Sequence, residues 1–216
     1  MVLVKVFKLL FIFIITQLIF KKNIYKVDNL LKYIRSLTTF SDRSWELLQP
    51  ALTKRAFKKN ALLLKEGQVC NSLFYIDKGY CKSYYEIDGV SKNTSFFFEN
   101  DMATNINSFG SGQKSEYNII ACEQLTAILF DREKLFQLSK EVHEIESLGR
   151  KCIRLFASKQ EEFSTLFKLY PARERLAYLE ANHPEIMQRV SLSQLASFLG
   201  VARETLSRIR RRRTLP

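Results

Sequence analysis

The chain has 216 residues, more than the roughly 100 to 150 common for one domain, which favours two modest domains over a single large one. Its formal net charge of +12 indicates a polyanionic partner, either nucleic acid or an anionic membrane. The sequence contains no P-loop, GxGxxG, HExxH or GxSxG motif, and its four cysteines form no CxxC pair and have no neighbouring histidine. We therefore expect no enzyme, no metal site and no bound cofactor.

The N-terminal segment 1–26 is apolar and flanked by lysines. Its apolar run, Leu9 to Phe20, is shorter than the roughly 20 residues of a membrane-spanning helix, and no small-residue cleavage site of a secretory signal follows it. Val27 opens a plausible first helix, and a valine codon can start translation in bacteria. We interpret residues 1–26 first as a mis-assigned start, then as a membrane anchor and last as a cleaved signal, and we expect a cytoplasmic protein.

The next part of the chain, residues 28–131, changes from helical to strand-like patterns. Apolar positions at helical spacing predict two short helices over residues 28–52, with Ser41 as an N-cap. Between Arg55 and Asp131, short runs rich in Phe, Tyr, Ile and Leu are broken by turn signals, which predicts a small barrel or sandwich of many strands. Asp88-Gly89 between two such runs predicts a hairpin, because this dipeptide accepts positive φ.

A long helix is predicted from Glu141 to Tyr170, where Pro171 ends it. Its mostly apolar stripe advances in steps of four and three: Ile145, Gly149, Cys152, Phe156, Lys159, Phe163, Leu166 and Tyr170. The stripe could face the chain's own barrel. A helix of about 30 residues is roughly 45 Å long, however, which is more than one small barrel covers. We therefore expect a second copy of the chain on this stripe, forming a homodimer.

The segment Val190 to Arg213 has the pattern of two helices joined by a tight turn. Ser191 and Gln194 form a capping-box pair, and Gly200 supplies a turn residue free to adopt positive φ. The inner faces of the two helices are apolar: Leu192, Leu195, Ala196 and Leu199 in the first, and Val201, Leu206 and Ile209 in the second. An ordinary amphipathic hairpin would show the same apolar spacing, so the outer face decides between that interpretation and a helix-turn-helix.

The outer face of the second helix and its C-terminal end carry the candidate DNA-binding residues: Arg203, Glu204, Ser207, Arg208, Arg211, Arg212 and Arg213. Arginine can bind guanine O6 and N7 with two hydrogen bonds, and glutamate can accept from cytosine N4. Arg210, Arg212 and Arg213 are suited to neutralising phosphates. This composition favours a DNA-reading helix-turn-helix over a bare helical hairpin.

The stretch LASFLGVARETLSRIRRR resembles the helix-turn-helix of the Crp/Fnr family of transcription regulators. The resemblance implies an α+β fold with an N-terminal antiparallel β-roll, jelly-roll-like and of the cyclic-nucleotide-binding type, over residues 27–140. A long dimerisation helix over 141–170 and a helix-turn-helix DNA-binding domain over 171–216 would follow. By the family motif, Arg203, Glu204 and Arg208 match base-reading positions.

The sequence departs from the family pattern at three places. Ala202 stands where Ser or Thr usually caps the recognition helix, and only seven residues follow Ile209, too few for a wing hairpin. In the cassette that binds cyclic nucleotides, Ser115 stands at the arginine position and Thr104-Asn105 where Gly-Glu is expected. Because a buried cyclic phosphate needs a charged partner, we expect an effector other than cyclic AMP, or none.

These features together predict a bacterial transcription regulator that binds double-stranded DNA as a sequence-specific homodimer. Such a regulator would also contact RNA polymerase. The alternative is a membrane-tethered, cyclic-nucleotide-binding-like sensor or adaptor, with the apolar N-terminus as its anchor and the arginine run attracted to anionic lipid.

Overall fold

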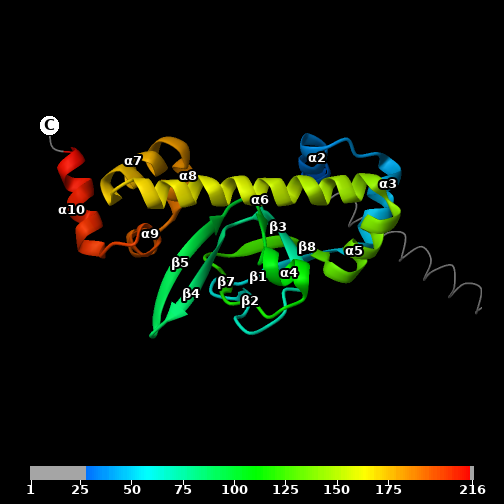
Figure 1. Ribbon diagram of the computed structural model, residues 1–216, viewed down its shortest axis with the longest axis horizontal. Coiled ribbons are helices and arrows are strands. Elements are labelled where there is room, and N and C mark those ends of the chain that lie inside the picture. The colour runs from blue at the N-terminus through cyan, green and yellow to red at the C-terminus, as the bar shows by residue number, and fades with distance from the viewer. Residues whose placement is uncertain (1–27, 215–216) are drawn as a thin grey trace, which may run out of the picture.

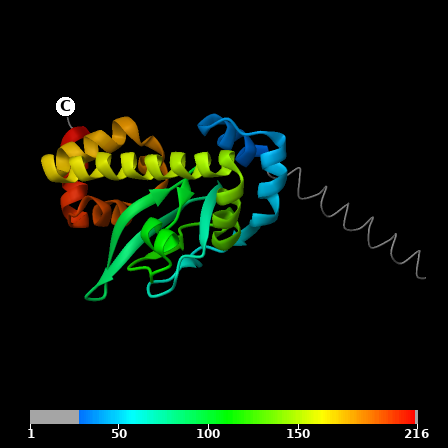
Figure 2. The same ribbon diagram turned by 45° about the vertical axis from the view of Figure 1, so that its right-hand side comes forward.

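The computed structural model describes the backbone of residues 28–214 and the side chains of residues 29–211. One long helix, α6 (His143–Leu169), runs across the molecule (Figure 1). The β-roll lies against one side of α6, two N-terminal helices lie at one end, and four C-terminal helices gather at the other (Figures 1 and 2). The segment 1–26, which we interpreted as a mis-assigned start, lies outside the described residues.

Two N-terminal helices cover part of the β-roll and the first turns of α6. They are α2 (Asp28–Leu37) and α3 (Asp42–Leu48), followed by the single 3-10 turn η1 (Gln49–Ala51). Ser41 caps α3 by accepting a hydrogen bond from the Ser44 amide, as predicted. Leu30 and Ile34 are fully buried in the core beneath α2.

The β-roll consists of two four-stranded antiparallel sheets. The first has the order β1 (Leu52–Phe57), β8 (Leu125–Asp131), β3 (Ser72–Lys78), β6 (Met102–Ala103). The second has the order β2 (Leu62–Leu64), β7 (Asn118–Ala121), β4 (Cys81–Ile87), β5 (Val90–Phe97). The predicted hairpin joins β4 and β5, and both of its turn residues have positive φ, 52° at Asp88 and 73° at Gly89.

Two helices accompany the roll. The short α4 (Ile106–Ser111) follows β6, and α5 (Arg132–Glu141) follows β8, with Asp131 capping its first turn. The sequence pattern predicted no helix over α5, which lies almost wholly before the predicted start of the long helix at Glu141. The break falls at Val142, whose backbone is extended, so α6 begins two residues later than predicted.

The predicted stripe of α6 is covered mainly by the chain itself. Ile145 and Cys152 are buried against the β-roll core, and Phe163 and Leu166 are buried against the C-terminal helices. The assignment of this stripe to a second copy of the chain is therefore wrong. We expected a second copy because a helix this long exceeds what one small barrel covers. The C-terminal unit, however, covers the half of α6 that the roll leaves uncovered.

The C-terminal unit contains α7 (Ala172–Asn182), α8 (Pro184–Arg189), α9 (Leu192–Leu199) and α10 (Arg203–Thr214). Leu176, Leu179, Leu199 and Leu206 of this unit are fully buried in a second cluster, which also includes Phe96 and Phe98 of the roll and Phe163 and Leu166 of α6. The predicted α+β class, with an antiparallel β-roll, a long helix and C-terminal helices, is confirmed. Within residues 28–214, no helix is both long and apolar enough to cross a bilayer.

Candidate nucleic-acid interface

Helix α9 begins and ends at the residues that the sequence predicted. The Ser191 hydroxyl accepts a hydrogen bond from the Gln194 amide at 3.3 Å, and the Gln194 side chain accepts one from the Ser191 amide at 3.4 Å, which completes the capping box. At the other end Gly200 has φ 71°, a left-handed conformation that a residue with a Cβ adopts with strain. The chain therefore reverses sharply into α10.

Helix α10 is fixed to α9 by its apolar side. Leu206 is fully buried, and Val201 and Ile209 pack against the same cluster. The small side chain of Ala196 is buried there, and its carbonyl accepts a hydrogen bond from the Val201 amide at 3.0 Å. Ala202 contributes only its carbonyl, which accepts from the Leu206 amide at 3.1 Å, so the first turn of α10 lacks a side-chain oxygen from this residue.

The opposite side of α10 gathers five of the seven predicted DNA-binding residues. Together with Leu192 they line one shallow hollow of about 330 Å³: Arg203, Glu204, Ser207, Arg208 and Arg211. The arginines and Glu204 are exposed, and Ser207 is half-buried. The side chains of Arg212 and Arg213 lie outside the described residues. The predicted base-reading positions thus share one charged, solvent-facing surface.

The C-terminal unit docks onto the β-roll through α9 and β5. The Ser197 hydroxyl donates to the Ser91 carbonyl at 2.9 Å and accepts from the Asn93 amide at 3.1 Å. The Asn93 side chain donates to the Gln194 carbonyl at 2.9 Å. These bonds give the outer edge strand of the second sheet a partner, and they fix the direction in which α10 points.

Arg189, the last residue of α8, forms the charged part of the same interface. Its guanidinium binds both carboxylate oxygens of Glu99, at 2.5 and 3.1 Å, and one of Glu123 at 2.5 Å. It also lies over the rings of Tyr80 and Phe98, at 5.2 and 5.4 Å from their centroids. Burial acts to raise the pKa of Glu99, but hydrogen bonds from Arg189 and from the backbone lower it on balance. Nothing in the sequence pattern singled out this cluster.

Phe198 of α9 forms the apolar centre of the docking. Its ring lies 5.3 Å from Phe96 of β5, and 5.5 and 5.3 Å from Phe163 and Phe167 of α6, each in an edge-to-face arrangement. The side chain is 4% exposed. One residue therefore joins the C-terminal unit to both the roll and the long helix.

The residues at the cyclic-nucleotide cassette are buried and bonded to one another. Asn105 donates to the Ser115 hydroxyl at 2.9 Å, and Ser115 in turn donates to the Tyr117 carbonyl at 2.7 Å. The Tyr117 hydroxyl donates to the Thr104 carbonyl at 3.1 Å, and burial raises the pKa of this phenol, which keeps it neutral. The side chains at these positions are thus uncharged, and several of their polar atoms already have partners.

We therefore expect cyclic AMP at millimolar concentration to leave the protein unaffected. Its phosphate would lose water without gaining a cationic partner from Ser115, which costs several kcal/mol in typical cases. Isothermal titration calorimetry measures this directly, with a regulator known to bind cyclic AMP as the positive control. A dissociation constant in the micromolar range would contradict both the cassette assignment and the electrostatic argument.

The β-roll matches a known domain family. Residues 54–141 match the cyclic nucleotide-binding domain, a span that runs from β1 to the end of α5. No curated protein sequence matches the chain. The roll therefore has the fold of a cyclic nucleotide-binding domain, whether or not its cassette binds such a ligand.

Solved structures extend the likeness to the long helix and the C-terminal unit. FixK2 from Bradyrhizobium japonicum is 17% identical, with a TM-score of 0.62 over 74% of this chain and 83% of its own. A putative transcriptional regulator of the Crp/Fnr family from Eubacterium rectale is 15% identical, with a TM-score of 0.62 over 80% of this chain and 83% of its own. The c-di-GMP responsive regulator CLP from Xanthomonas campestris is 17% identical, with a TM-score of 0.60 over 80% and 91%.

The fold and the roll together define a class of protein. A cyclic nucleotide-binding roll, a long connecting helix and a C-terminal helical unit follow one another along the chain, and these solved structures match most of that span in fold. The chain has the architecture of the Crp/Fnr family, and the resemblance carried by the α9–α10 sequence is confirmed at the level of fold.

Proposed function

We propose that the protein is a Crp/Fnr-type transcription regulator that reads duplex DNA with α10. The observation that carries the proposal is the single exposed face on which Arg203, Glu204, Arg208 and Arg211 lie together, opposite the buried anchor Leu206. These side chains have the donors and the acceptor that base edges in the major groove require. The net charge of +12 supplies a sequence-independent attraction to phosphates.

Sequencing the fragments that purified protein selects from random duplex DNA tests this function. We expect an enriched motif with two related half-sites about 34 Å apart, since a symmetric dimer presents two recognition helices. A selected pool without any enriched motif would contradict sequence-specific reading. Cell fractionation addresses the alternative: a native protein found only with membranes would favour the tethered sensor or adaptor over the cytoplasmic regulator that we propose.

We further propose that the protein acts as a homodimer through the outward face of α6. Four exposed residues follow one another on this face at steps of four, four and three: Gly149, Ile153, Ala157 and Gln160. Ile153 is 57% exposed. Of these four positions only Gly149 belongs to the originally predicted stripe, most of which the chain itself covers. Small residues on either side of Ile153 would let two α6 helices approach closely. In this arrangement the sensor domain is residues 27–140 and the dimerisation helix is residues 141–170. The DNA-binding domain, residues 171–216, also contacts RNA polymerase.

Ile153→Lys should therefore shift the protein from dimer to monomer. Two lysines would face each other across the helix pair, where the wild-type side chains bury apolar area. We expect the dimer dissociation constant to rise at least about tenfold, equivalent to about 1.4 kcal/mol, in sedimentation equilibrium. Thr165→Lys, at an exposed position on another side of α6, is the matched control and should leave the constant unchanged. A wild-type protein that sediments as a monomer at all concentrations would rule the dimer out.

A further inference from the structure

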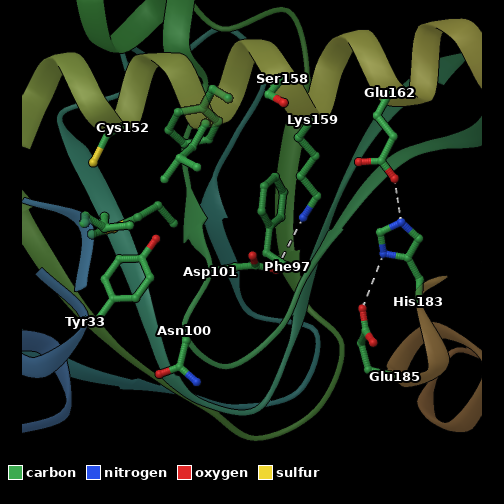
Figure 3. A pocket seen from close by; sticks show the side chains of 14 residues that line it. Tyr33, Phe97, Asn100, Asp101, Cys152, Ser158, Lys159, Glu162, His183 and Glu185 are labelled. Atoms are coloured by element: carbon green, nitrogen blue, oxygen red, sulfur yellow. Dashed lines mark hydrogen bonds and ion pairs between the residues drawn. The ribbon is translucent and has the colours of Figure 1, made fainter.

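A cavity of about 490 Å³ lies where the β-roll, α2, α6 and the start of α8 meet (Figure 3). We call it the junction cavity. Its size falls within the range of sites for small organic molecules, which often lie between domains. It is separate from the cyclic-nucleotide cassette, because its lining includes none of Thr104, Asn105 and Ser115. Neither the family match nor the proposed DNA interface gives it a role.

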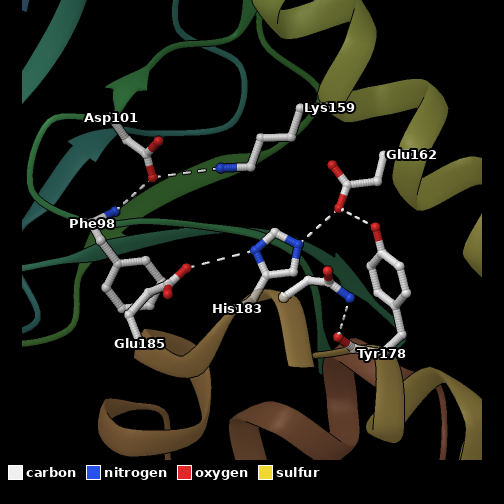
Figure 4. A network of polar contacts seen from close by, with 8 residues as sticks. Phe98, Asp101, Lys159, Glu162, Tyr178, His183 and Glu185 are labelled. Carbon is white, nitrogen blue, oxygen red and sulfur yellow. Dashed lines mark hydrogen bonds and ion pairs between the residues drawn. The ribbon is translucent and has the colours of Figure 1, made fainter. Parts of the chain in front are cut away.

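One end of the junction cavity is polar and holds His183 between two carboxylates. His183 Nε2 lies 2.8 Å from Glu162 Oε1, and its Nδ1 lies 3.6 Å from Glu185 Oε1 (Figure 4). The Tyr178 hydroxyl donates to the same Glu162 oxygen at 2.9 Å. Burial acts to raise the pKa of Glu162, but these hydrogen bonds lower it on balance, so this carboxylate is charged near neutral pH.

A second charged pair lies beside the first. Lys159 Nζ is 3.5 Å from Asp101 Oδ2, which also accepts from the Phe98 amide at 2.9 Å. Within the described residues, no hydrogen bond reaches Asp101 Oδ1 or Glu162 Oε2. The cavity therefore offers acceptors that are not yet used by the protein.

The charge balance of the lining favours a cationic ligand. Three carboxylates, Asp101, Glu162 and Glu185, stand against Lys159 and, when it is protonated, His183. The lining is thus net negative in either protonation state of the histidine. An anion would be repelled by this lining, whereas an ammonium group would gain charge-assisted hydrogen bonds.

The other end of the junction cavity is apolar and aromatic. Phe97, Phe156 and Tyr33 line it, and the Lys159 ammonium already lies 5.7 Å from the Phe97 ring centroid. Burial raises the pKa of Tyr33 to about 12, so its phenol is neutral. Aromatic faces attract organic cations and provide the area against which an apolar body packs. A metal ion fits less well, because no cluster of metal-ligating side chains occurs in the part of the chain that the structure describes.

We propose that the junction cavity binds an amphipathic organic amine, with its ammonium group between Glu162 and Asp101 and its apolar body against Phe97, Phe156 and Tyr33. Such a ligand would touch the roll, α6 and the α7–α8 connection at once. On the proposed DNA-binding function, it would therefore bias the orientation of α10 by favouring one docking of the C-terminal unit. The binding itself does not depend on that function.

Calorimetric titration of the full chain with three matched probes tests the site. We expect 2-phenylethylamine to bind at least about tenfold more tightly than neutral 2-phenylethanol, and phenylacetate to bind more weakly still. Glu162→Gln should weaken the amine at least about tenfold, because the neutral amide loses the charge that the ammonium needs. Glu161→Gln, next to it but exposed and outside the cavity lining, should leave the affinity unchanged.

A second variant separates ligand binding from damage to the Glu162 network. Ser158→Trp adds a large side chain at an exposed position of the lining and should block the amine while His183 and Tyr178 keep their partners. Amine affinity that survives Ser158→Trp would overturn the proposed location. No heat from 2-phenylethylamine at about 10 mM, or tighter binding of phenylacetate, would overturn the ligand class. DNA titrations with saturating amine then report the coupling alone.

Discussion

Phe198→Ala should lower the free energy of unfolding of the C-terminal unit by about 3 to 5 kcal/mol. The substitution removes a buried ring that packs edge-to-face on Phe96, Phe163 and Phe167. The cavity left behind is bounded by two rigid elements, β5 and α6, so it can collapse only in part. Because the ring joins three parts of the molecule, the C-terminal unit should then melt before the β-roll.

Differential scanning calorimetry measures this effect as a second transition at lower temperature. Phe136→Ala is the matched control, since Phe136 is 38% exposed on α5 and its ring packs on that of Phe109, with the centroids 5.5 Å apart. Its removal should cost less than half as much free energy. Equal losses of stability for the two variants would show that Phe198 does not hold the docked arrangement.

Local sequence signals predicted the α9–α10 geometry well. The Ser191–Gln194 capping box and the left-handed turn at Gly200 each depend on residues within a few positions of one another. Few other local conformations suit these residue types at this spacing. The same holds for the Asp88-Gly89 hairpin. Helical periodicity was then sufficient to place Arg203, Glu204 and Arg208 on one side, because Leu206 fixed the opposite side.

Interactions between distant segments could not be predicted in this way. Asn93 and Gln194 are 101 residues apart, and Arg189 is 90 residues from Glu99. Hydrophobic periodicity along the chain does not indicate such pairs, because each partner taken alone is an ordinary polar residue on its own helix, strand or turn. The apolar stripe of α6 failed for a related reason: its spacing shows that one side is buried but does not identify the surface that covers it.

On the proposed function, the same docking gives a roll whose cassette residues bond to one another a physical contact through which to influence DNA binding. Glu99 lies just beyond β5, next to Asn100 and Asp101 of the junction cavity, and it holds Arg189 at the end of α8. A shift of this turn would therefore reach α9 through Arg189 and through the hydrogen bonds between β5 and Ser197. On the proposed function, the contacts that link the roll to α10 therefore run through this interface as well as through α6.

Arg208→Ala should cost about 1 to 3 kcal/mol for each half-site on the preferred duplex, and about twice that for a symmetric dimer. Arg208 is exposed on the hollow face of α10, one turn after Glu204, and its guanidinium makes a long hydrogen bond, 3.4 Å, to the Thr205 hydroxyl. The guanidinium thus keeps donors for guanine O6 and N7. Sequence preference at the position that Arg208 reads should relax, while binding to scrambled duplexes should hardly change.

Arg213→Ala is the matched comparison, because Arg213 follows in the last turn of α10, beyond the anchor Ile209. If Arg213 binds a phosphate, its removal should weaken binding to all duplexes alike. The slope of log K against log salt concentration should then fall by roughly one for each phosphate that is no longer neutralised, or about two for a dimer. Titrations of both variants against specific and scrambled duplexes at several salt concentrations separate the two roles. If Arg208→Ala weakened both duplexes equally, its side chain would bind phosphate, and base reading would have to come from Arg203 and Glu204 instead.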